Sequence, residues 1–326
     1  MITQVGWLVL VTAGFLLLPA TARPTLPFGI RVPRERAGEL RSIRVAYRMV
    51  VVVFGVAATA AALAGVTGLL PVLVVACLLA HWAAAGFVAR AKRSWPTGRQ
   101  GVTTDTSLRT DLVRLPWPYL VPAVAFVAGT VVLGLVADPV QRTGSTFWNA
   151  AWPVTNQVVV LVLAVFAVVT IPRARPELDA ARPESSARAY RAYLTGMVRI
   201  VALVATAVIA ALAVKALLLW RLVTPGTAWT VLTIALPAAA FAVALIWLVR
   251  AGDAGHRLNR DDSEDTGVVQ RDDDQHWHLG GLVYVNRTDP ALLVHQRVGS
   301  RWTLNLGHPA SWLTLVALLV VVLLTN

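Results

Sequence analysis

The chain contains the stretch WPYLVPAVAFVAGTVVLGLVA, from Trp117 to Ala137, in which no residue is charged. An α-helix needs about 17 to 25 predominantly apolar residues to cross about 30 Å of hydrocarbon, and this stretch has that length. Seven further runs meet the same condition, the last being the shortest: residues 2–22, 49–69, 70–89, 154–171, 198–219, 228–249 and 309–325. The sequence therefore predicts an all-α polytopic membrane protein with eight transmembrane helices.

The composition supports this class. Of the 326 residues, 57% are hydrophobic and 14% are charged, and the mean hydropathy is +0.65. Soluble domains carry about 25% charged residues, so we expect the lipid bilayer to be the main partner. The net charge of +12 comes mostly from arginines in short loops beside apolar runs, where they orient a chain in the membrane. We therefore expect no nucleic-acid partner.

Basic residues are distributed unevenly between the loops. The loops after the first, third and fifth apolar runs are rich in arginine, whereas those after the second, fourth and sixth contain at most one basic residue, Arg142 or Arg221. Because positively charged short loops stay in the cytoplasm, the sequence predicts that both termini face outward (N-out/C-out). Tryptophans near both ends of the predicted helices are typical of the aromatic belts at the two interfaces.

Arginine far outnumbers lysine, and alanine and valine are abundant, which is typical of GC-rich bacterial genomes. We therefore expect a multi-pass protein of the bacterial cytoplasmic (inner) membrane. The first run ends in Ala20-Thr21-Ala22, which resembles a secretory cleavage site, but no lysine or arginine precedes the run. At this point cleavage of the first segment stays an alternative.

Residues 251–308, between the seventh and eighth apolar runs, form a polar insert that is mildly acidic where the other predicted cytoplasmic loops are basic. The first part of this insert has almost no apolar residues, which predicts a flexible linker. The predicted organisation is a seven-helix membrane region (1–250), an acidic flexible linker (251–275), a small cytoplasmic module (276–308) and the eighth helix (309–326).

The module is predicted to form a three-stranded β-meander between helices seven and eight. Its strands would be the short apolar or alternating runs Leu282–Val285, Leu292–Val298 and Arg301–Leu306. The dipeptide Gly299-Ser300 suits a two-residue hairpin turn between the last two strands.

A sheet this small is not stable alone, and its apolar face needs cover. The alternation in the third predicted strand places Trp302, Leu304 and Leu306 on one face. Together with Trp277 and Tyr284 from the same module, these residues form a candidate docking surface for a partner or for the cytoplasmic ends of the helices.

The module also carries the most specific sequence of the chain. His276-Trp277, the Gly-Gly-Leu-Val-Tyr-Val-Asn run at 280–286, Asp289-Pro290 and the Trp-Thr-Leu-Asn run at 302–305 resemble the short module catalogued as domain of unknown function 5808. Such modules accompany bacterial membrane proteins with domain of unknown function 1648.

Two loop segments, Pro-Phe-Gly-Ile-Arg-Val-Pro at 27–33 and Arg-Pro-Glu-Leu-Asp at 175–179, also resemble the domain 1648 proteins. More distantly, that group is similar to SdpI-like immunity proteins, which protect bacteria from their own membrane-active toxins. The resemblance implies a related role. The outer loop 138–153 departs from the family pattern because it lacks the usual histidine and Pro-Asp, which puts any role of that element in doubt.

His81 lies near the middle of the third predicted helix and is the candidate intramembrane polar site, because ionisable groups at that depth are costly. The alternative is a neutral imidazole hydrogen-bonded to a neighbouring helix. Asn156 and Gln157 are expected at the outer interface, where water satisfies them.

His276 and His278, two residues apart beside Asp272 to Asp274, are weak candidates for metal ligands. The alternative is a solvated acidic turn. Cys77 is the only cysteine, so a disulfide within the chain and a four-cysteine metal site are excluded.

The zinc-protease, nucleophile-elbow and phosphate-loop motifs are missing from the sequence. We therefore expect no enzyme, no catalytic or cofactor-binding residue and no cofactor. The first hypothesis is a membrane protein that binds a hydrophobic peptide or membrane-protein partner, in toxin immunity or envelope sensing. The alternatives are a small-solute transporter or permease, with His81 as its central polar group, and a scaffold that docks a cytosolic protein through residues 272–308.

Overall fold

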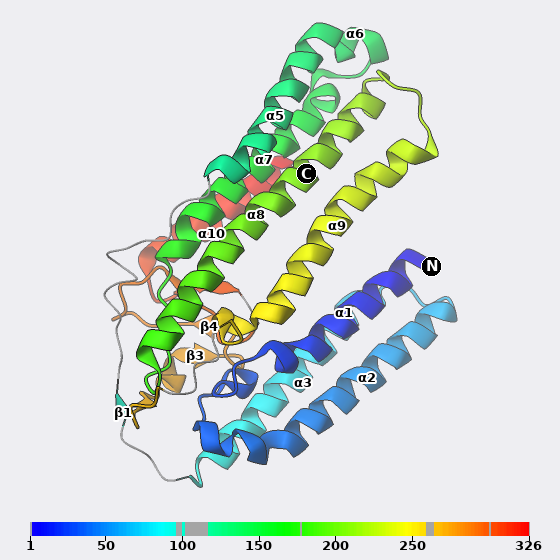
Figure 1. Cartoon of the computed structure of the whole chain (residues 1–326). Helices are drawn as coiled ribbons and strands as arrows, with labels where there is room; N and C mark the ends of the chain where they lie inside the picture. Colours follow the sequence, from blue (N-terminus) through cyan, green and yellow to red (C-terminus); the bar gives the residue numbers. More distant parts are fainter. Residues whose placement is uncertain are drawn as a thin grey trace. The chain divides into compact units, whose positions relative to one another are not determined.

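The computed structural model (Figure 1) describes residues 2–95, 100–101, 117–176, 178–258, 264–299 and 301–325. The chain divides into two compact units. Unit 1 comprises Met1–Asp105, Arg175–Tyr190 and Ala251–Ser311, and unit 2 comprises Thr106–Ala174, Arg191–Arg250 and Trp312–Asn326. The insert therefore groups with the first three helices, whereas the sequence analysis divided the chain at residue 250.

Seven helices in the described ranges are long and apolar enough to cross a membrane, which indicates a multi-pass membrane protein. Their exposed apolar side chains, such as Leu135 at 79% and Val136 at 81%, suit contact with lipid. The helices are α1 (Ile2–Thr21), α2 (Arg41–Leu63), α3 (Leu69–Lys92), α5 (Trp117–Ala137), α7 (Phe147–Thr170), α8 (Pro183–Leu219) and α9 (Thr227–Ala251).

Helix α10 (Pro309–Thr325) occupies the eighth predicted run. Its 17 residues are at the lower limit for crossing the hydrocarbon, and its described apolar part, Pro309–Val320, is shorter than the seven long helices. The count of eight crossings and the N-out/C-out orientation therefore stay predictions.

Several helices extend beyond the apolar runs that predicted them. Helix α8 begins at Pro183 rather than Val198, and α7 begins at Phe147 rather than Val154. The added part of α8 before Val198, about four turns long, contains several alanines and arginines, which favour a helix whether or not it lies in lipid. The end of an apolar run therefore does not mark the end of the helix.

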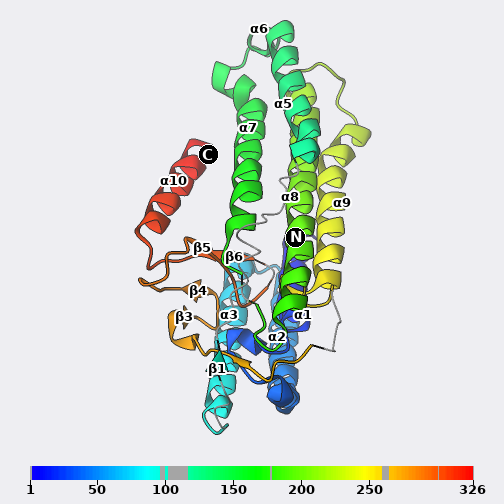
Figure 2. The ribbon, with the colours of Figure 1, turned by 60° about the vertical axis from the view of Figure 1, so that its left-hand side comes forward.

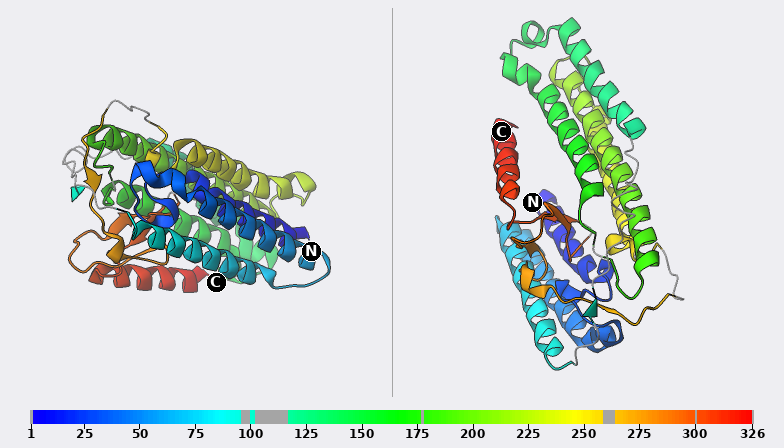
Figure 3. Two further views of the ribbon diagram at one scale, coloured as in Figure 1. Left: turned by 90° about the horizontal axis from the view of Figure 1, so that it is seen from below. Right: turned by 90° about the vertical axis from the view of Figure 1, so that its left-hand side faces the viewer.

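In unit 1, α1, α2 and α3 pack along one another (Figure 3). Their shared core includes the fully buried side chains of Leu8, Val51, Cys77 and Val88. Gly55 of α2 lets the helix approach Thr12 of α1 closely, because a Cβ there would lie 2.4 Å from the threonine methyl. The segment between α1 and α2 forms two 3-10 helices, η1 (Pro27–Gly29) and η2 (Arg34–Leu40).

The strands of the insert form short pairs instead of the predicted three-stranded meander. Strand β3 (Trp277–His278) pairs antiparallel with β4 (Val283–Tyr284), and β5 (Leu293–His295) pairs antiparallel with β6 (Trp302–Leu304). A parallel bridge between Tyr284 and Asn305 is what links the two pairs.

The prediction of a two-residue hairpin turn is also wrong. The β5–β6 register pairs His295 with Trp302, and the Gln296 amide donates to the Arg301 carbonyl. The chain therefore turns over the residues between Gln296 and Arg301. Buried Arg297 lies in this connection, so the loop is held by contacts outside the hairpin as well as by turn residues.

The described parts of the predicted flexible linker are packed against the rest of unit 1. Asp253 lies in the 3-10 helix η4 (Asp253–Gly255) and is fully buried. Strand β2 (Val269–Gln270) pairs in parallel with β1 (Gln100–Gly101). The 3-10 helix η5 (Asp274–His276) follows. Four aspartates of this segment pair with basic residues, and these pairs hold it against the rest of unit 1: Asp253, Asp272, Asp273 and Asp274.

Unit 2 contains α5, the short α6 (Pro139–Thr143), α7, the 3-10 helix η3 (Ile171–Arg173), most of α8, and α9. Figure 2 shows its long helices running alongside one another. Trp220 joins three of its elements: the ring lies 3.0 Å from where a Cβ on Gly134 would be, and the indole Nε1 donates to the Ala150 carbonyl at 2.8 Å. Within residues 138–153, predicted as an outer loop, Asp138 caps α6 and Thr146 caps α7, which already begins at Phe147.

Candidate functional site

In unit 1 the insert lies directly against the segment between α1 and α2. A Cβ on Gly29 would be 2.3 Å from the Gly280 carbonyl oxygen, and one on Gly281 would be 2.7 Å from the Gly29 Cα. All three glycines have positive φ, 79°, 66° and 83° for Gly29, Gly280 and Gly281, a region that strains other residues. The backbones therefore touch only because no side chain intervenes.

His81 of α3 is buried beneath this glycine contact. Its Nε2 lies 3.1 Å from the Gly280 carbonyl oxygen, so the ring donates a hydrogen bond there as the Nε2–H tautomer. The rings of Phe28 and Tyr47 lie against it, with centroids at 5.6 and 6.2 Å. The expected partner on a neighbouring helix is thus replaced by the backbone of the insert.

Three consecutive aspartates form a second contact between the insert and the helices. Lys92, the last residue of α3, lies 2.7 Å from an Asp272 oxygen and 2.6 Å from an Asp274 oxygen. Arg31 pairs with Asp273 at 3.2 Å. Burial raises the pKa of the Asp272 carboxyl, but the hydrogen bond and charge of Lys92 outweigh it and hold the pKa below its usual range.

Arg297 lies at the centre of these contacts and is fully buried. It pairs with Asp273 and Asp274 and donates to the Gly29 carbonyl at 3.1 Å. Its guanidinium also lies over the Trp277 ring, 5.1 Å from the centroid. A buried cation that lost its carboxylates would be strongly unfavourable, so Arg297 holds η1, η5 and the β5–β6 connection together.

A further buried ion pair links the ends of α1 and α9 to the insert. The Asp253 carboxylate lies 2.8 Å from His295 Nε2 and 3.2 Å from Arg23 Nε, and neither Asp253 nor the His295 side chain is exposed. The rings of Tyr190 and Trp302 flank His295 at 5.7 and 5.4 Å. Through Asp253, His295 of β5 is thus connected to Arg23 at the end of α1.

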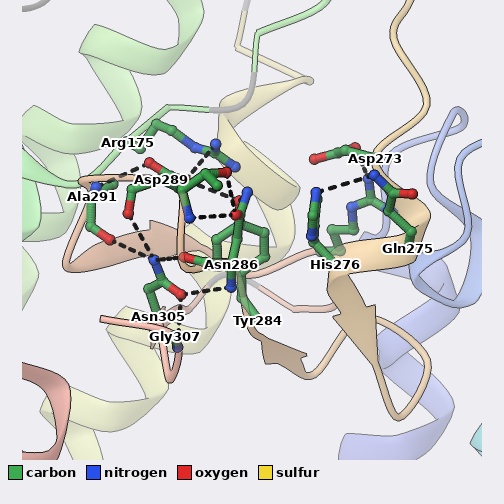
Figure 4. A network of polar contacts seen from close by, with 12 residues as sticks. Arg175, Asp273, Gln275, His276, Tyr284, Asn286, Asp289, Ala291, Asn305 and Gly307 are labelled. Atoms are coloured by element: carbon green, nitrogen blue, oxygen red, sulfur yellow. Dashed lines mark hydrogen bonds and ion pairs between the residues drawn. The ribbon is translucent and has the colours of Figure 1, made fainter. Parts of the chain in front are cut away.

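Within the insert, Asn305 organises the turns around it (Figure 4). Its side-chain amide donates to the carbonyl oxygens of Asn286, Asp289 and Ala291 at 2.8, 3.1 and 3.2 Å. Its Oδ1 accepts from the Asn286 and Gly307 amides. Every polar atom of this buried side chain is therefore satisfied, which explains how so short a sheet keeps one conformation.

The candidate docking surface is partly buried within unit 1. Trp277 and Tyr284 are buried, at 8% and 1% exposure, and pack with Val294 in the core of the insert. The other three residues, Trp302, Leu304 and Leu306, are half-buried. In this conformation Trp277 and Tyr284 are not accessible to a partner, and the rest of the predicted surface is only partly so.

The two histidines considered as metal ligands do not converge. His276 lies in η5, where its Nε2 is 3.2 Å from the Gln275 side-chain nitrogen, and His278 is exposed on β3. In the described ranges, no three His, Cys, Asp or Glu residues are arranged to hold a metal ion. The metal hypothesis gains no support from the geometry.

Unit 1 also contains an open cavity of about 190 Å³. Four arginines from two segments line it, against the carboxylates of Glu35 and Asp179. Its wall includes the apolar side chains of Leu26, Val32 and Leu178, and His256 and Gln270 of the insert complete it. The four arginines are Arg23, Arg31, Arg34 and Arg182.

Sequence reasoning missed a buried polar residue in unit 2. Gln157 of α7 is fully buried, and its side-chain nitrogen donates to Thr130 Oγ1 of α5 at 3.1 Å and to the Ile209 carbonyl of α8 at 3.0 Å. The expectation of an outer-interface position failed because α7 begins at Phe147, which places Gln157 well inside the helix. The available signal was the residue type itself, a glutamine directly before the apolar run Val158–Val160.

No family model matches the chain, and neither a curated protein nor a solved structure matches it. The resemblance to the modules 5808 and 1648 and to SdpI-like immunity proteins therefore stays a prediction from the residues quoted above.

Proposed function

We propose that the chain is a non-enzymatic, multi-pass protein of a bacterial inner membrane that binds a hydrophobic or amphipathic partner, in toxin immunity or envelope sensing. The observation that carries the proposal is the attachment of the insert to α3 and to the η1 segment. Gly280 bonds His81 of α3, and Lys92 at the end of the same helix pairs with Asp272 and Asp274.

This attachment supplies a physical route from the membrane to the insert. A partner that binds among α1, α2 and α3 changes their spacing, and close-packed contacts transmit such a change because they do not deform continuously. The contact between Gly29 and Gly280 is close-packed in this sense, since a Cβ on Gly29 would already overlap Gly280. The insert then acts as the reporter of a binding event in the bilayer.

The contacts of the histidines support a non-enzymatic role. Buried His81 bonds a backbone carbonyl, and buried His295 bonds Asp253. Both roles are structural. The His81 contact also weakens the transporter alternative, because the ring that would handle a solute bonds the chain itself. The scaffold alternative is weakened by the burial of Trp277 and Tyr284.

The test is survival of cells that lack the gene when they are exposed to a panel of membrane-active peptides. We expect deletion to sensitise cells to at least one peptide and the full-length gene to restore resistance. Gly29→Val, which forces the insert away from η1, should fail to restore it at equal expression. Gly38→Val is the matched control, because nothing lies within 4 Å of a Cβ at Gly38.

Unchanged survival of the deletion strain across the panel would reject the immunity role. Equal rescue by the two glycine variants would reject the route through the insert. A soluble protein crosslinked to the full-length chain in native membranes, in place of a membrane partner, would favour the scaffold.

A further inference from the structure

We infer that the turn between β3 and β4 dips into the bilayer, in the leaflet on the side of the insert, and contacts lipid acyl chains through Leu279. The turn touches α3 in the middle of that helix. The Gly280 carbonyl accepts a hydrogen bond from His81, and a Cβ on Gly280 would lie 3.1 Å from the Ala85 Cβ. Leu279 precedes Gly280 in the chain, so the Cα atoms of the two residues lie within about 4 Å of each other. The depth of His81 in the membrane therefore fixes the depth of the turn.

Two helices of unit 1 measure this depth from the turn that joins them. Helix α2 ends at Leu63, α3 begins at Leu69, and the two helices pack along each other. At the rise of an α-helix, His81 lies about 18 Å from Leu69 along α3. The first charged residue met from the same turn is Arg48 on α2, at about 22 Å, and Arg90 on α3, at about 31 Å. Because an arginine side chain can extend from such a position to the interface, we place His81 within the hydrocarbon, which is about 30 Å thick.

The composition and the contacts of the hairpin suit this depth. Residues 275–286, which include both strands and the turn, contain no Asp, Glu, Lys or Arg. Irregular backbone at membrane depth has to be shielded by protein. Gly280 and Gly281 are buried, and so is the 3-10 helix η1 (Pro27–Gly29) that lies against them. The backbone of the turn thus faces α3 and η1.

The charge of Arg297 is compatible with a turn in lipid. Arg297 lies beside the turn, because a Cβ on Gly281 would be 2.9 Å from the Arg297 Cβ. Its side chain is fully buried and pairs with Asp273 and Asp274. Charged groups within a bilayer face the protein and pair with one another. Asp274 also pairs with Lys92, the last residue of α3, so this cluster of charges continues toward the end of the helix.

Leu279 is the residue of the turn that meets lipid. It is 53% exposed, and its φ of 50° lies in the left-handed region that favours glycine. Strain of this kind persists where another interaction offsets it, and contact of the exposed side chain with acyl chains is such an interaction. Trp82, the neighbour of His81 on α3, is 57% exposed, so the helix also presents apolar surface near this depth. Lipid contact by the turn goes beyond the proposed function, since it requires neither a binding partner nor immunity.

The experiment is electron paramagnetic resonance on the full-length Cys77→Ala protein with a nitroxide spin label attached at Leu279→Cys. The protein is reconstituted in liposomes of phosphatidylcholine and phosphatidylglycerol. Power saturation compares collisions of the label with oxygen, which concentrates in hydrocarbon, and with a water-soluble nickel complex. We expect oxygen accessibility to exceed nickel accessibility at position 279. The thermal midpoint of the labelled protein reports whether it is folded.

Two matched variants supply the references for lipid and for water. Val53→Cys is the lipid reference, because Val53 is 61% exposed on α2, about 15 Å from the α2–α3 turn. Arg271→Cys is the water reference, because Arg271 is exposed and precedes Asp272, which pairs with Lys92 at the end of α3. We expect position 279 to resemble position 53, and the order of the two accessibilities to be reversed at position 271.

His278→Cys is the second variant if substitution of Leu279 prevents folding. His278 is exposed and adjoins Leu279, so its label should give the same order of accessibilities. Nickel accessibility above oxygen accessibility at these positions, as at position 271, would overturn the inference, because the turn would then lie in water. Low accessibility to both reagents would also overturn it, because another part of the protein would then cover Leu279.

Discussion

At the residue scale, the buried polar side chains carry the specificity of the fold. An exposed apolar side chain can contact lipid in many orientations. A buried amide or ion pair needs its partners at hydrogen-bonding distance, which restricts the arrangement of the elements around it. The side chain of Asn305 makes five hydrogen bonds within the insert, and that of Gln157 donates to both α5 and α8. Substitutions at such positions therefore test the structure most directly.

Gln157→Leu should destabilise unit 2 by about 1 kcal/mol, the usual scale of an interhelical hydrogen bond in a membrane protein. The change removes the bonds to Thr130 Oγ1 and the Ile209 carbonyl while keeping the side-chain volume similar. Thermal unfolding in detergent measures it. Asn156→Leu is the control, because Asn156 is exposed and its side chain donates to the Trp152 carbonyl of its own helix. Equal loss in both variants would contradict the buried position of Gln157.

A second residue-scale prediction concerns pH. Burial lowers the pKa of His256 below its usual range, although the carbonyl and charge of Asp253 oppose the shift and Arg23 and Arg257 reinforce it. The unfolded chain therefore binds a proton below about pH 6.5 that the folded chain resists. The contribution of the neutral ring to stability is complete above that pH and is lost as the pH falls toward the folded pKa.

His256→Gln should accordingly reduce the fall in thermal midpoint between pH 7 and pH 5. Measurements at pH 8, where the ring is neutral in both states, provide the reference for any pH-independent effect of the substitution. An identical fall in wild type and variant would show that His256 does not contribute to the pH dependence.

At the element scale, the sequence predicted the helices better than their contacts. The bounds of α5 and α10 match the predicted runs, whereas α7 and α8 begin before theirs. The bond between His81 and Gly280 joins residues 199 apart. Periodicity indicates which face of a strand is apolar but not what covers that face. It could therefore not predict that Arg297 lies over the Trp277 ring.

The acidic segment illustrates the same limit. Low hydrophobicity predicted a flexible linker, yet Asp253 and Asp274 are partners of Arg23 and of Lys92 and Arg297. Composition describes the charge of a segment but not the distant charge it meets. Ion pairs whose partners lie on other elements can therefore order a segment that has few apolar residues.

Asp274→Asn should loosen the insert, because it weakens the contacts to both Lys92 and buried Arg297. A loss of about 1.4 kcal/mol corresponds to about tenfold more frequent opening. Limited trypsin digestion measures this as faster cleavage in the insert, for example after exposed Arg271. Asp265→Asn is the control, since Asp265 is exposed and its side chain accepts from the nearby Gly267 amide. Equal cleavage rates would contradict a role of Asp274 in docking the insert.

At the scale of the whole molecule, the number of crossings determines the orientation of the C-terminus. Within the described ranges seven helices are long enough to span, and α10 decides whether their total is even or odd. If α10 crosses, both termini lie on the side opposite the insert; if it rests at the interface, the C-terminus stays on the side of the insert. Arginine distribution favours an insert on the cytoplasmic side.

Single cysteines in whole cells distinguish these cases. Cys77, the only cysteine, is buried in the α1–α3 core, and Cys77→Ala gives a background without thiols. A cysteine appended after Asn326 should react with a membrane-impermeant maleimide in intact cells, because a crossing α10 delivers the C-terminus outside. Asp265→Cys, in the insert, should react only after permeabilisation, and Gly226→Cys, before α9, should react in intact cells. Labelling of the appended cysteine only after permeabilisation would show that α10 does not cross and that the protein has seven spans.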